Sequence, residues 1–313
     1  MSTPVLLLLG LVLLAVGGDV LVRGAVATAT RLGVSPLLIG LTLVGFGTST
    51  PELVTSLEAA LRGAPGIAVG NVVGSNIANI LLILGVAAVI APFAVGAAFR
   101  RDGTAVVLSA VLLVAVCLLG RIGPVIGGAF LALLLAYLVL SVRQDRAAGA
   151  GAATAPPERK PMPVPLALLL VAGGIAATIL GARWLVEGAV RLAAGLGVSE
   201  TVIGLTIVAV GTSLPELVTS VTAALRRQGD IAFGNVLGSN VFNVLFILGA
   251  TALVRPIDVP ASIARVDVWV VLAASLGLAL VARTGWRVTR AEGAGLLAAY
   301  LAYLAYLGLG AAG

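Results

Sequence analysis

The chain has 313 residues, of which 60% are hydrophobic and only 10% are charged, and its mean hydropathy is +1.17. Soluble domains carry about 25% charged residues, so 19 basic and 13 acidic side chains are too few to cover a water-soluble protein of 31.1 kDa. Histidine is absent, which excludes a Ser-His-Asp triad and the commonest zinc ligand. The single cysteine, Cys117, excludes an intramolecular disulfide framework.

The net charge of +6 would suggest nucleic-acid binding in a soluble protein. Here the basic residues lie in short loops between apolar runs, and aromatic residues make up only 4% of the chain, too few for base-stacking surfaces. The charge therefore indicates orientation in a lipid bilayer. Since no nucleophile–base arrangement is visible, we expect neither an enzyme nor a cofactor, and no nucleic-acid partner.

Ten apolar segments follow one another, each close to the roughly 20 residues that cross a bilayer. The first has no basic region before it, so we interpret it as a retained membrane helix rather than a signal sequence. Between the fifth and sixth segments lies a polar stretch rich in Ala, Gly and Pro, which predicts a flexible linker at 144–163. The segments are residues 4–27, 34–60, 67–90, 103–120, 122–141, 164–190, 198–224, 231–254, 266–282 and 291–310.

The chain contains an internal duplication. Residues 17–85 align with residues 181–249 without a gap, and 42 of the 69 positions are identical, including polar residues, glycines and prolines. Five segments per repeat is an odd number, so the repeats must have opposite orientations, as in many secondary transporters. We therefore expect an all-α integral membrane protein of ten transmembrane helices, in which residues 1–143 and 164–313 form two inverted five-helix repeats of one membrane domain.

The basic residues predict the orientation of these helices. If the N-terminus lies outside, 13 of the 19 basic residues fall in inner loops or at inner segment ends, and six fall on the outer side. Cytoplasmic loops of membrane proteins carry an excess of Lys and Arg. We therefore expect a multi-pass protein of the cell inner (plasma) membrane with both termini outside and the linker in the cytoplasm.

Two carboxylates lie in the middle of apolar segments. Glu52 and Glu216 occupy equivalent positions of the repeats, and no basic residue lies at the same depth to pair with them. A charge at this depth costs at least about 2.5 kcal/mol. Pro51 and Pro215 precede them, and because proline lacks an N–H, each breaks a helical hydrogen bond and frees carbonyl oxygen. A purely structural carboxylate and a simple bend are the alternatives, but the duplication favours a cation site.

Hydroxyl groups extend each carboxylate along one helix face. Thr48, Glu52 and Ser56 are spaced by four residues, and residues at this spacing are neighbours on a helix. We expect these hydroxyls to add to the oxygen cluster at the kink. The equivalent residues of the second repeat are Thr212, Glu216 and Ser220.

The third and eighth segments carry a second polar stripe. Ser75 and Asn79 are four residues apart, as are Ser239 and Asn243. All these groups are hard oxygen donors, which suit Ca²⁺ or Na⁺ rather than soft metals. Two carboxylates can neutralise one Ca²⁺ or hold Na⁺ in separate subsites, so binding of Ca²⁺ and binding of Na⁺ would exclude each other. Four further amides of these segments could equally bind ions or only join helices: Asn71, Asn76, Asn235 and Asn240.

The duplicated blocks Gly-Thr-Ser-x-Pro-Glu, from Gly47 and Gly211, and Gly-Ser-Asn-x-x-Asn, from Gly74 and Gly238, are specific motifs. They resemble the alpha-repeats of the cation/Ca²⁺ exchanger superfamily, specifically the prokaryotic sodium/calcium exchangers. The resemblance covers the ten-segment plan. It implies electrogenic antiport of three Na⁺ for one Ca²⁺ by alternating access, with a monomer as the functional unit. It also implies that the first and sixth helices slide across a fixed core.

The resemblance further implies the ligands of the transported ions. Those of Ca²⁺ are two carboxylates and two backbone oxygens, from Glu52, Glu216, Thr48 and Thr212. Those that serve Na⁺ or line the site are Ser49, Ser213, Ser75, Ser239, Asn79, Asn243 and the carbonyls of Gly45 and Ala209.

Asn243 departs from some relatives, including potassium-dependent exchangers, which carry Asp at this position. Asparagine removes a charge, so we do not expect K⁺ to be co-transported, and we expect the Asn243 amide to donate to Glu216. Two other functions stay open. One is a Ca²⁺/H⁺ antiporter that uses the same glutamates as proton acceptors, and the other is a cation channel with an acidic filter. An inverted duplication with broken central helices favours a carrier over a channel.

Overall fold

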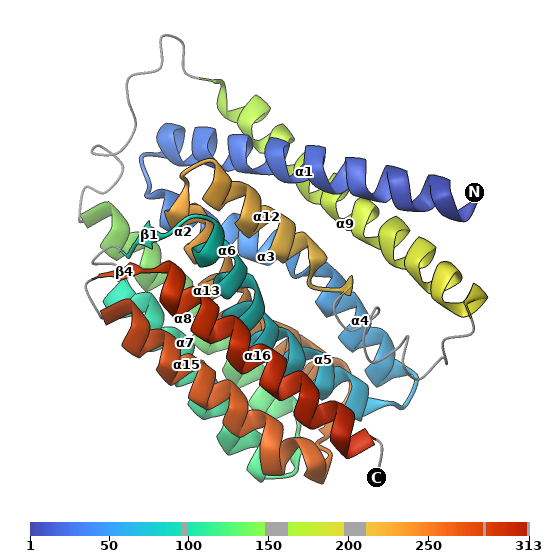
Figure 1. The fold of residues 1–313 in the computed structure, drawn as a ribbon. Coiled ribbons are helices and arrows are strands. Elements are labelled where there is room, and N and C mark those ends of the chain that lie inside the picture. The colour runs from blue at the N-terminus through green and yellow to red at the C-terminus, as the bar shows by residue number, and fades with distance from the viewer. Residues whose placement is uncertain (96–98, 148–161, 197–210, 284–285, 312–313) are drawn as a thin grey trace.

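The computed structural model describes residues 1–95, 99–147, 162–196, 211–283 and 286–311, and these residues are almost entirely helical (Figure 1). The first half contains α1 (Thr3–Leu32), α2 (Pro36–Ile39), the π-helix η1 (Gly40–Val44), α3 (Gly45–Thr48), α4 (Thr50–Leu61), α5 (Pro65–Ile77), the π-helix η2 (Ala78–Ile83), α6 (Leu84–Ile90), β1 (Phe93–Ala94), α7 (Phe99–Leu118), β2 (Arg121–Ile122) and α8 (Pro124–Ala147). The second half contains α9 (Val164–Gly195), α12 (Leu214–Leu225), α13 (Gly229–Phe242), the π-helix η4 (Asn243–Leu248), α14 (Gly249–Val254), β3 (Ile257–Asp258), the π-helix η5 (Ile263–Asp267), α15 (Val268–Arg283), β4 (Arg287–Val288) and α16 (Arg290–Ala311).

Many of these helices are long and apolar, which confirms the predicted class, an all-α membrane protein. In the described part of the chain, seven helical stretches are long and apolar enough to cross a membrane, and a bent pair makes eight. The expected segment 198–224 falls partly outside the described residues, which resume at Gly211 and lead into the 12-residue apolar helix α12. The expected segment 291–310 lies in α16. The count of ten membrane helices stays a prediction.

The predicted kink in the second segment is confirmed. The stretch Pro36–Thr48 is bent by 42° relative to Thr50–Leu61, and the break falls at Ser49. Proline at the start of α4 explains the break, because Pro51 has no N–H to continue the helical ladder. The bend places Ser49 at the interruption and Glu52 in the first turn of the helix that follows it.

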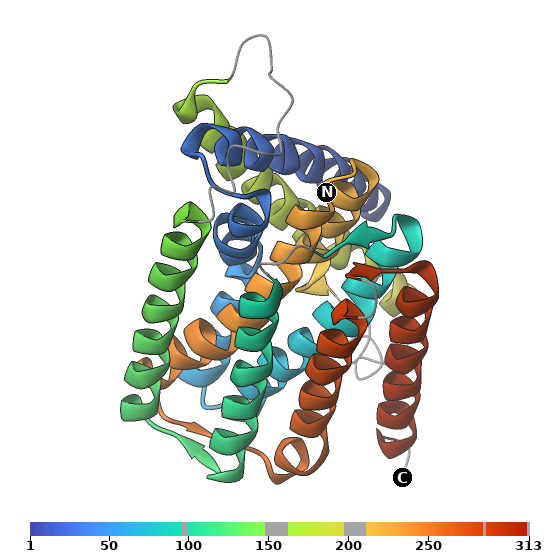
Figure 2. The same cartoon turned by 90° about the vertical axis from the view of Figure 1, so that its left-hand side faces the viewer.

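Helices α1 and α9 form a long crossed pair that lies obliquely over the other helices (Figures 1 and 2). Glycines form the contact between them. A Cβ atom added at Gly174 would lie 2.6 Å from the backbone nitrogen of Leu21, and one at Gly24 would lie 2.7 Å from that of Val171. Small residues of this kind let two membrane helices approach at backbone distance.

Substituting Gly174 tests this contact. Gly174→Ala is expected to destabilise the protein by about 1–3 kcal/mol, because the new methyl group overlaps backbone that cannot rotate away. Gly173→Ala is the matched control, since a Cβ there meets no described atom within 4 Å. The measurement is the thermal unfolding midpoint of the purified variants in detergent. Equal midpoints for the two variants would show that α1 and α9 do not pack this closely.

Short strand pairs join the two halves of the chain. β1 pairs antiparallel with β4, with Phe93 opposite Val288, and β2 pairs with β3, with Arg121 opposite Asp258. The first strands of the two halves begin at Phe93 and Ile257, which are 164 residues apart, the same offset that relates the sequence repeats. Helices of the first half also pack against helices of the second: α6 packs on α16, α8 on α14 and α7 on α15 (Figure 2).

Candidate functional site

Glu52 is held at the centre of the protein by a serine of the other half. It lies in the first turn of α4, and only 1% of the residue is exposed. The hydroxyl of Ser213, just before α12, donates to Glu52 Oε1 at 3.3 Å. The same hydroxyl lies 3.4 Å from Ser75 Oγ on α5. The carboxylate is thus joined to two other helical segments.

Glu216 has the same surroundings with the halves exchanged. It lies in the first turn of α12 and is also 1% exposed. Ser49 donates to Glu216 Oε1 at 3.0 Å, and its hydroxyl lies 3.0 Å from Ser239 Oγ on α13. Each glutamate therefore depends on a serine from the opposite half, so the site forms only when both halves are packed together.

Several buried side-chain oxygens of α4, α12 and the π-helices η4 and η2, which pack against them, have no hydrogen-bond partner among the described residues. They include one carboxylate oxygen from each glutamate, Glu52 Oε2 and Glu216 Oε2, and the amide oxygens of Asn79 and Asn243. Neither glutamate forms an ion pair in the described part of the chain. Burying unpaired carboxylate oxygens is costly. Anionic and neutral oxygens gathered in this way fit the ligand preferences of Ca²⁺ and Na⁺.

The hydroxyls one turn beyond each glutamate, those of Ser56 and Ser220, accept hydrogen bonds from asparagines. Asn71 donates to Ser56 Oγ at 3.0 Å and to the backbone oxygen of Glu52 at 3.1 Å. Asn235 makes the same two bonds, to Ser220 Oγ at 2.9 Å and to the Glu216 oxygen at 3.3 Å. These amides brace the glutamate helices against α5 and α13.

Thr48 and Gly45 also have partners within the protein. The Thr48 hydroxyl lies 3.1 Å from both Asn235 Oδ1 and the Val44 oxygen. The Gly45 oxygen accepts the Ser49 N–H at 3.1 Å. A Cβ at Gly45 would lie 3.2 Å from the backbone nitrogen of Ser239, so this glycine allows α3 to approach α13.

The structure describes one of the two remaining predicted ligands, Thr212 and Ala209. Thr212 lies just before α12 and lines a cavity next to the cluster. Ala209 lies outside the described residues.

Asn243 does not donate to Glu216, so the expected contact is wrong. Its Nδ2 donates instead to Asn76 Oδ1 at 2.9 Å, across to the other half of the chain. Asn243 begins the π-helix η4, and Asn79 is the second residue of the π-helix η2. π-helical turns inside α-helices are frequent at functional sites. The change of helix type alters the direction of side chains at this point, which a helical spacing of four residues could not reveal.

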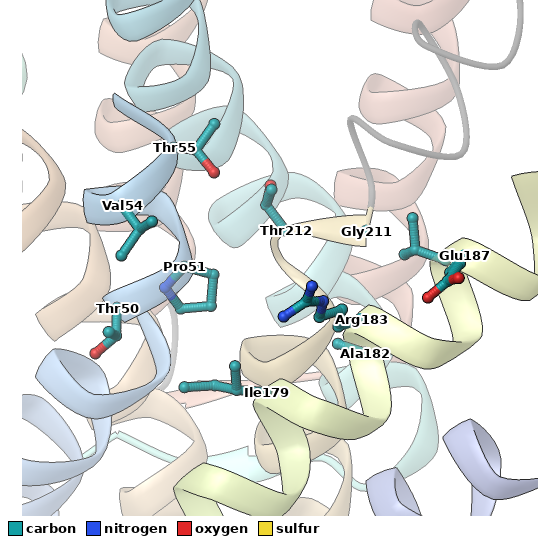
Figure 3. A pocket seen from close by; sticks show the side chains of 11 residues that line it. Thr50, Pro51, Val54, Thr55, Ile179, Ala182, Arg183, Glu187, Gly211 and Thr212 are labelled. Atoms are coloured by element: carbon teal, nitrogen blue, oxygen red, sulfur yellow. The ribbon is translucent and has the colours of Figure 1, made fainter. Parts of the chain in front are cut away.

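A cavity of about 520 Å³ lies beside the cluster, between α4 and α9 (Figure 3). Arg183 and Glu187 of α9 lie on one side, and Thr50 and Pro51 lie on the other. The cavity extends to Gly211 and Thr212, but neither Glu52 nor Glu216 lines it. Pro51, which precedes Glu52 in the chain, is therefore the lining residue that lies nearest in sequence to either of these two glutamates.

Comparisons with known proteins cover nearly the whole chain. Residues 2–143 and 166–309 match the family model described as sodium/calcium exchanger protein. The chain is 38% identical over 317 residues to the putative antiporter CaxA of Alkalimonas amylolytica, with 96% of both chains covered. It is 37% identical over 341 residues to the sodium/calcium exchanger MaX1 of Methanosarcina acetivorans, with 96% and 97% covered. Its fold is similar to a solved structure of the sodium-calcium exchanger NCX_Mj soaked with 10 mM Na⁺ and 10 mM Sr²⁺, with a TM-score of 0.85, 34% identity and 97% of both chains covered.

Proposed function

The chain belongs to the sodium/calcium exchanger family, and on that premise we propose that it is a secondary active antiporter that exchanges Na⁺ for Ca²⁺. Family membership alone establishes that the chain is a multi-pass membrane transporter that carries out cation/Ca²⁺ antiport. The proposal adds Na⁺ as the coupling ion, with three Na⁺ exchanged per Ca²⁺. It also adds a monomeric unit in the cell inner membrane with both termini outside.

One observation carries the proposal. Glu52 and Glu216 are both 1% exposed, each is held by a serine of the other half, and each keeps one carboxylate oxygen without a partner among the described residues. Two such carboxylates neutralise one Ca²⁺, and the surrounding serine and asparagine oxygens provide neutral ligands. The ligands proposed on this basis and on the family resemblance are Glu52, Glu216, Thr48, Thr212, Ser49, Ser213, Ser75, Ser239, Asn79, Asn243, Gly45 and Ala209.

The ten-helix plan with two inverted repeats, residues 1–143 and 164–313 joined by 144–163, is part of the proposal. The mirrored contacts of the two glutamates support it, since every partner of one has its equivalent 164 residues away in the other. The exchanged strand pairs, β1 with β4 and β2 with β3, support it as well. Inverted repeats around a central site are common among carriers that alternate access.

The α1–α9 pair is the proposed moving part. The cavity beside Arg183 lies on the outer side in the predicted orientation, between α9 and the helix that carries Glu52. On the inner side, Arg226 at the end of α12 pairs with Asp19 of α1, and Arg23 pairs with the same carboxylate at 2.8 Å. The pair between Arg226 and Asp19 would tie α12 to α1, so sliding of α1 and α9 across the other helices would have to break it.

Flux measurements in proteoliposomes test the coupling ion. We expect ⁴⁵Ca²⁺ to accumulate when a Na⁺ gradient is imposed, and not when only a pH gradient is imposed. Uptake driven by the pH gradient alone would identify the Ca²⁺/H⁺ antiporter instead. Saturable uptake that requires a counter-ion on the opposite side indicates a carrier, whereas uptake that needs no counter-ion would indicate a channel.

Transport is expected to be indifferent to K⁺. Asn243 is neutral, so the cluster offers two carboxylates, Glu52 and Glu216, and no third one for an added cation. The measurement is Na⁺-driven ⁴⁵Ca²⁺ uptake with K⁺ replaced by choline on both sides of the membrane. If uptake collapses without K⁺, the inference from Asn243 is wrong and the protein works as a potassium-dependent exchanger.

A further inference from the structure

A buried chain of amides connects the two halves of the chain. Asn243 Nδ2 donates to Asn76 Oδ1 at 2.9 Å, and Asn76 Nδ2 donates to the backbone oxygen of Asn240 at 3.4 Å. All three residues are 1% exposed. Asn76 is thereby used at both ends of its amide, as an acceptor for Asn243 and as a donor to α13.

The contact with Asn76 decides which end of the Asn243 amide is free. An amide has an acceptor oxygen and a donor NH₂ group, and only the oxygen can bind a cation. Because the NH₂ group of Asn243 is bonded to Asn76, its oxygen is the end left without a partner in the described chain. Asn243 begins the π-helix η4, which packs against α4, the helix that carries Glu52.

We propose that Asn76 is a positioning residue, which fixes the amide of Asn243 so that its oxygen, and not its NH₂ group, is presented to the transported cation. The inference rests on the proposed ion site and assigns a role to a residue outside the ligand set. Asn76 acts on ion binding only through Asn243. Without the acceptor oxygen of Asn76, the side-chain amide of Asn243 could flip and exchange the positions of its oxygen and its NH₂ group.

The second half of the chain lacks the equivalent contact, although its sequence motif is the same. Asn240 occupies the position equivalent to Asn76, 164 residues later. Its Nδ2 donates to the Val236 oxygen of its own helix at 2.7 Å, and its Oδ1 has no partner among the described residues. Asn240 therefore does not hold Asn79 as Asn76 holds Asn243. The two ligand asparagines are equivalent in sequence and different in how they are fixed.

This difference provides a matched control. Asn76→Leu removes the acceptor for Asn243, whereas Asn240→Leu keeps the backbone oxygen that Asn76 bonds and leaves the Asn76–Asn243 contact in place. We expect Asn76→Leu to raise the KM for Ca²⁺ by up to about tenfold, the upper end for losing one hydrogen bond between neutral groups, with a smaller change in maximum rate. Asn240→Leu is expected to keep a KM close to that of the wild type.

A double-mutant cycle separates positioning from a general structural role. Asn76→Leu, Asn243→Ala and the double variant are compared by the KM of Na⁺-driven ⁴⁵Ca²⁺ uptake and by equilibrium ⁴⁵Ca²⁺ binding to the purified proteins. If Asn76 acts through Asn243, the double variant binds Ca²⁺ as weakly as Asn243→Ala alone. Losses that multiply in the double variant, or an equal loss in Asn240→Leu, would overturn the proposal.

A charged replacement keeps the test decisive if Asn76→Leu fails to fold. Asn76→Asp retains an acceptor of the same shape for the Asn243 N–H and adds negative charge near the site, so its KM for Ca²⁺ should be at or below that of the wild type. A KM about ten times that of the wild type in this variant would contradict the proposal. The binding measurement needs no transport, so an effect of Asn76 on Ca²⁺ affinity can be recognised even if Na⁺ proves not to be the coupling ion.

Discussion

Glu52→Gln and Glu216→Gln are each expected to abolish Na⁺-driven Ca²⁺ uptake while leaving the protein folded. Glutamine has nearly the same shape, so the contacts from Ser213 and Ser49 to Oε1 can persist. What is lost is half of the negative charge that would neutralise Ca²⁺. A divalent cation buried beside a single carboxylate keeps an uncompensated charge, which is strongly unfavourable. The measurement is initial ⁴⁵Ca²⁺ uptake into proteoliposomes, with the thermal unfolding midpoint as the check on folding.

Glu58→Gln on α4, the helix that carries Glu52, is the control for these variants. Glu58 is exposed and pairs with Arg62 at 3.1 Å, four residues away. Exposed pairs of this kind contribute about 0–1 kcal/mol to stability, so this variant should transport like the wild type. Uptake at the wild-type rate by Glu52→Gln or Glu216→Gln would remove both residues from the proposed ion site.

The Ca²⁺ gradient reached at equilibrium is expected to follow the membrane potential. Exchange of three Na⁺ for one Ca²⁺ moves one net positive charge per cycle, which corresponds to about 2.3 kcal/mol per 100 mV. Since about 1.4 kcal/mol is a tenfold change in an equilibrium ratio, making the vesicle interior 100 mV more negative should lower the ratio of internal to external Ca²⁺ about 50-fold.

This result holds for either orientation of the protein in the vesicle, because it depends only on the charge moved per cycle. The potential is set by a K⁺ gradient with valinomycin at a fixed Na⁺ gradient, and the internal Ca²⁺ is measured at the end of uptake. A Ca²⁺ ratio unaffected by the potential would indicate electroneutral exchange, with two Na⁺ or two H⁺ per Ca²⁺.

Those features that depend on position along a single helix could be predicted from the sequence. The central glutamates were predictable because an unpaired charge in an apolar segment is costly, and the repeat showed both at once. The bend at Ser49 follows from Pro51, whose effect on the helix is local. The grouping of Ser75 and Ser239 with the glutamates followed from helical spacing and from the duplication, and the structure places both near the expected carboxylates.

The contacts between helices could not be predicted in the same way. Ser56 lies on the expected side of its helix, but its partner is Asn71, and that choice depends on how α4 packs on α5. The direction of the Asn243 amide depends on the π-helical turn that begins there and on the acceptor offered by Asn76. Identical motifs in the two repeats gave no indication that Asn76 and Asn240 would form different hydrogen bonds.

Competition between Na⁺ and Ca²⁺ for the purified protein tests most directly the claim that one buried site serves both ions. Equilibrium ⁴⁵Ca²⁺ binding is measured in detergent with increasing Na⁺, with choline as the control for ionic strength. If both ions use Glu52 and Glu216, Na⁺ should displace Ca²⁺ completely and with a steep dependence on its concentration, choline should not, and Glu216→Gln should abolish the binding. Ca²⁺ that stays bound at saturating Na⁺, or that binds Glu216→Gln as tightly as the wild type, would contradict a shared site at these carboxylates.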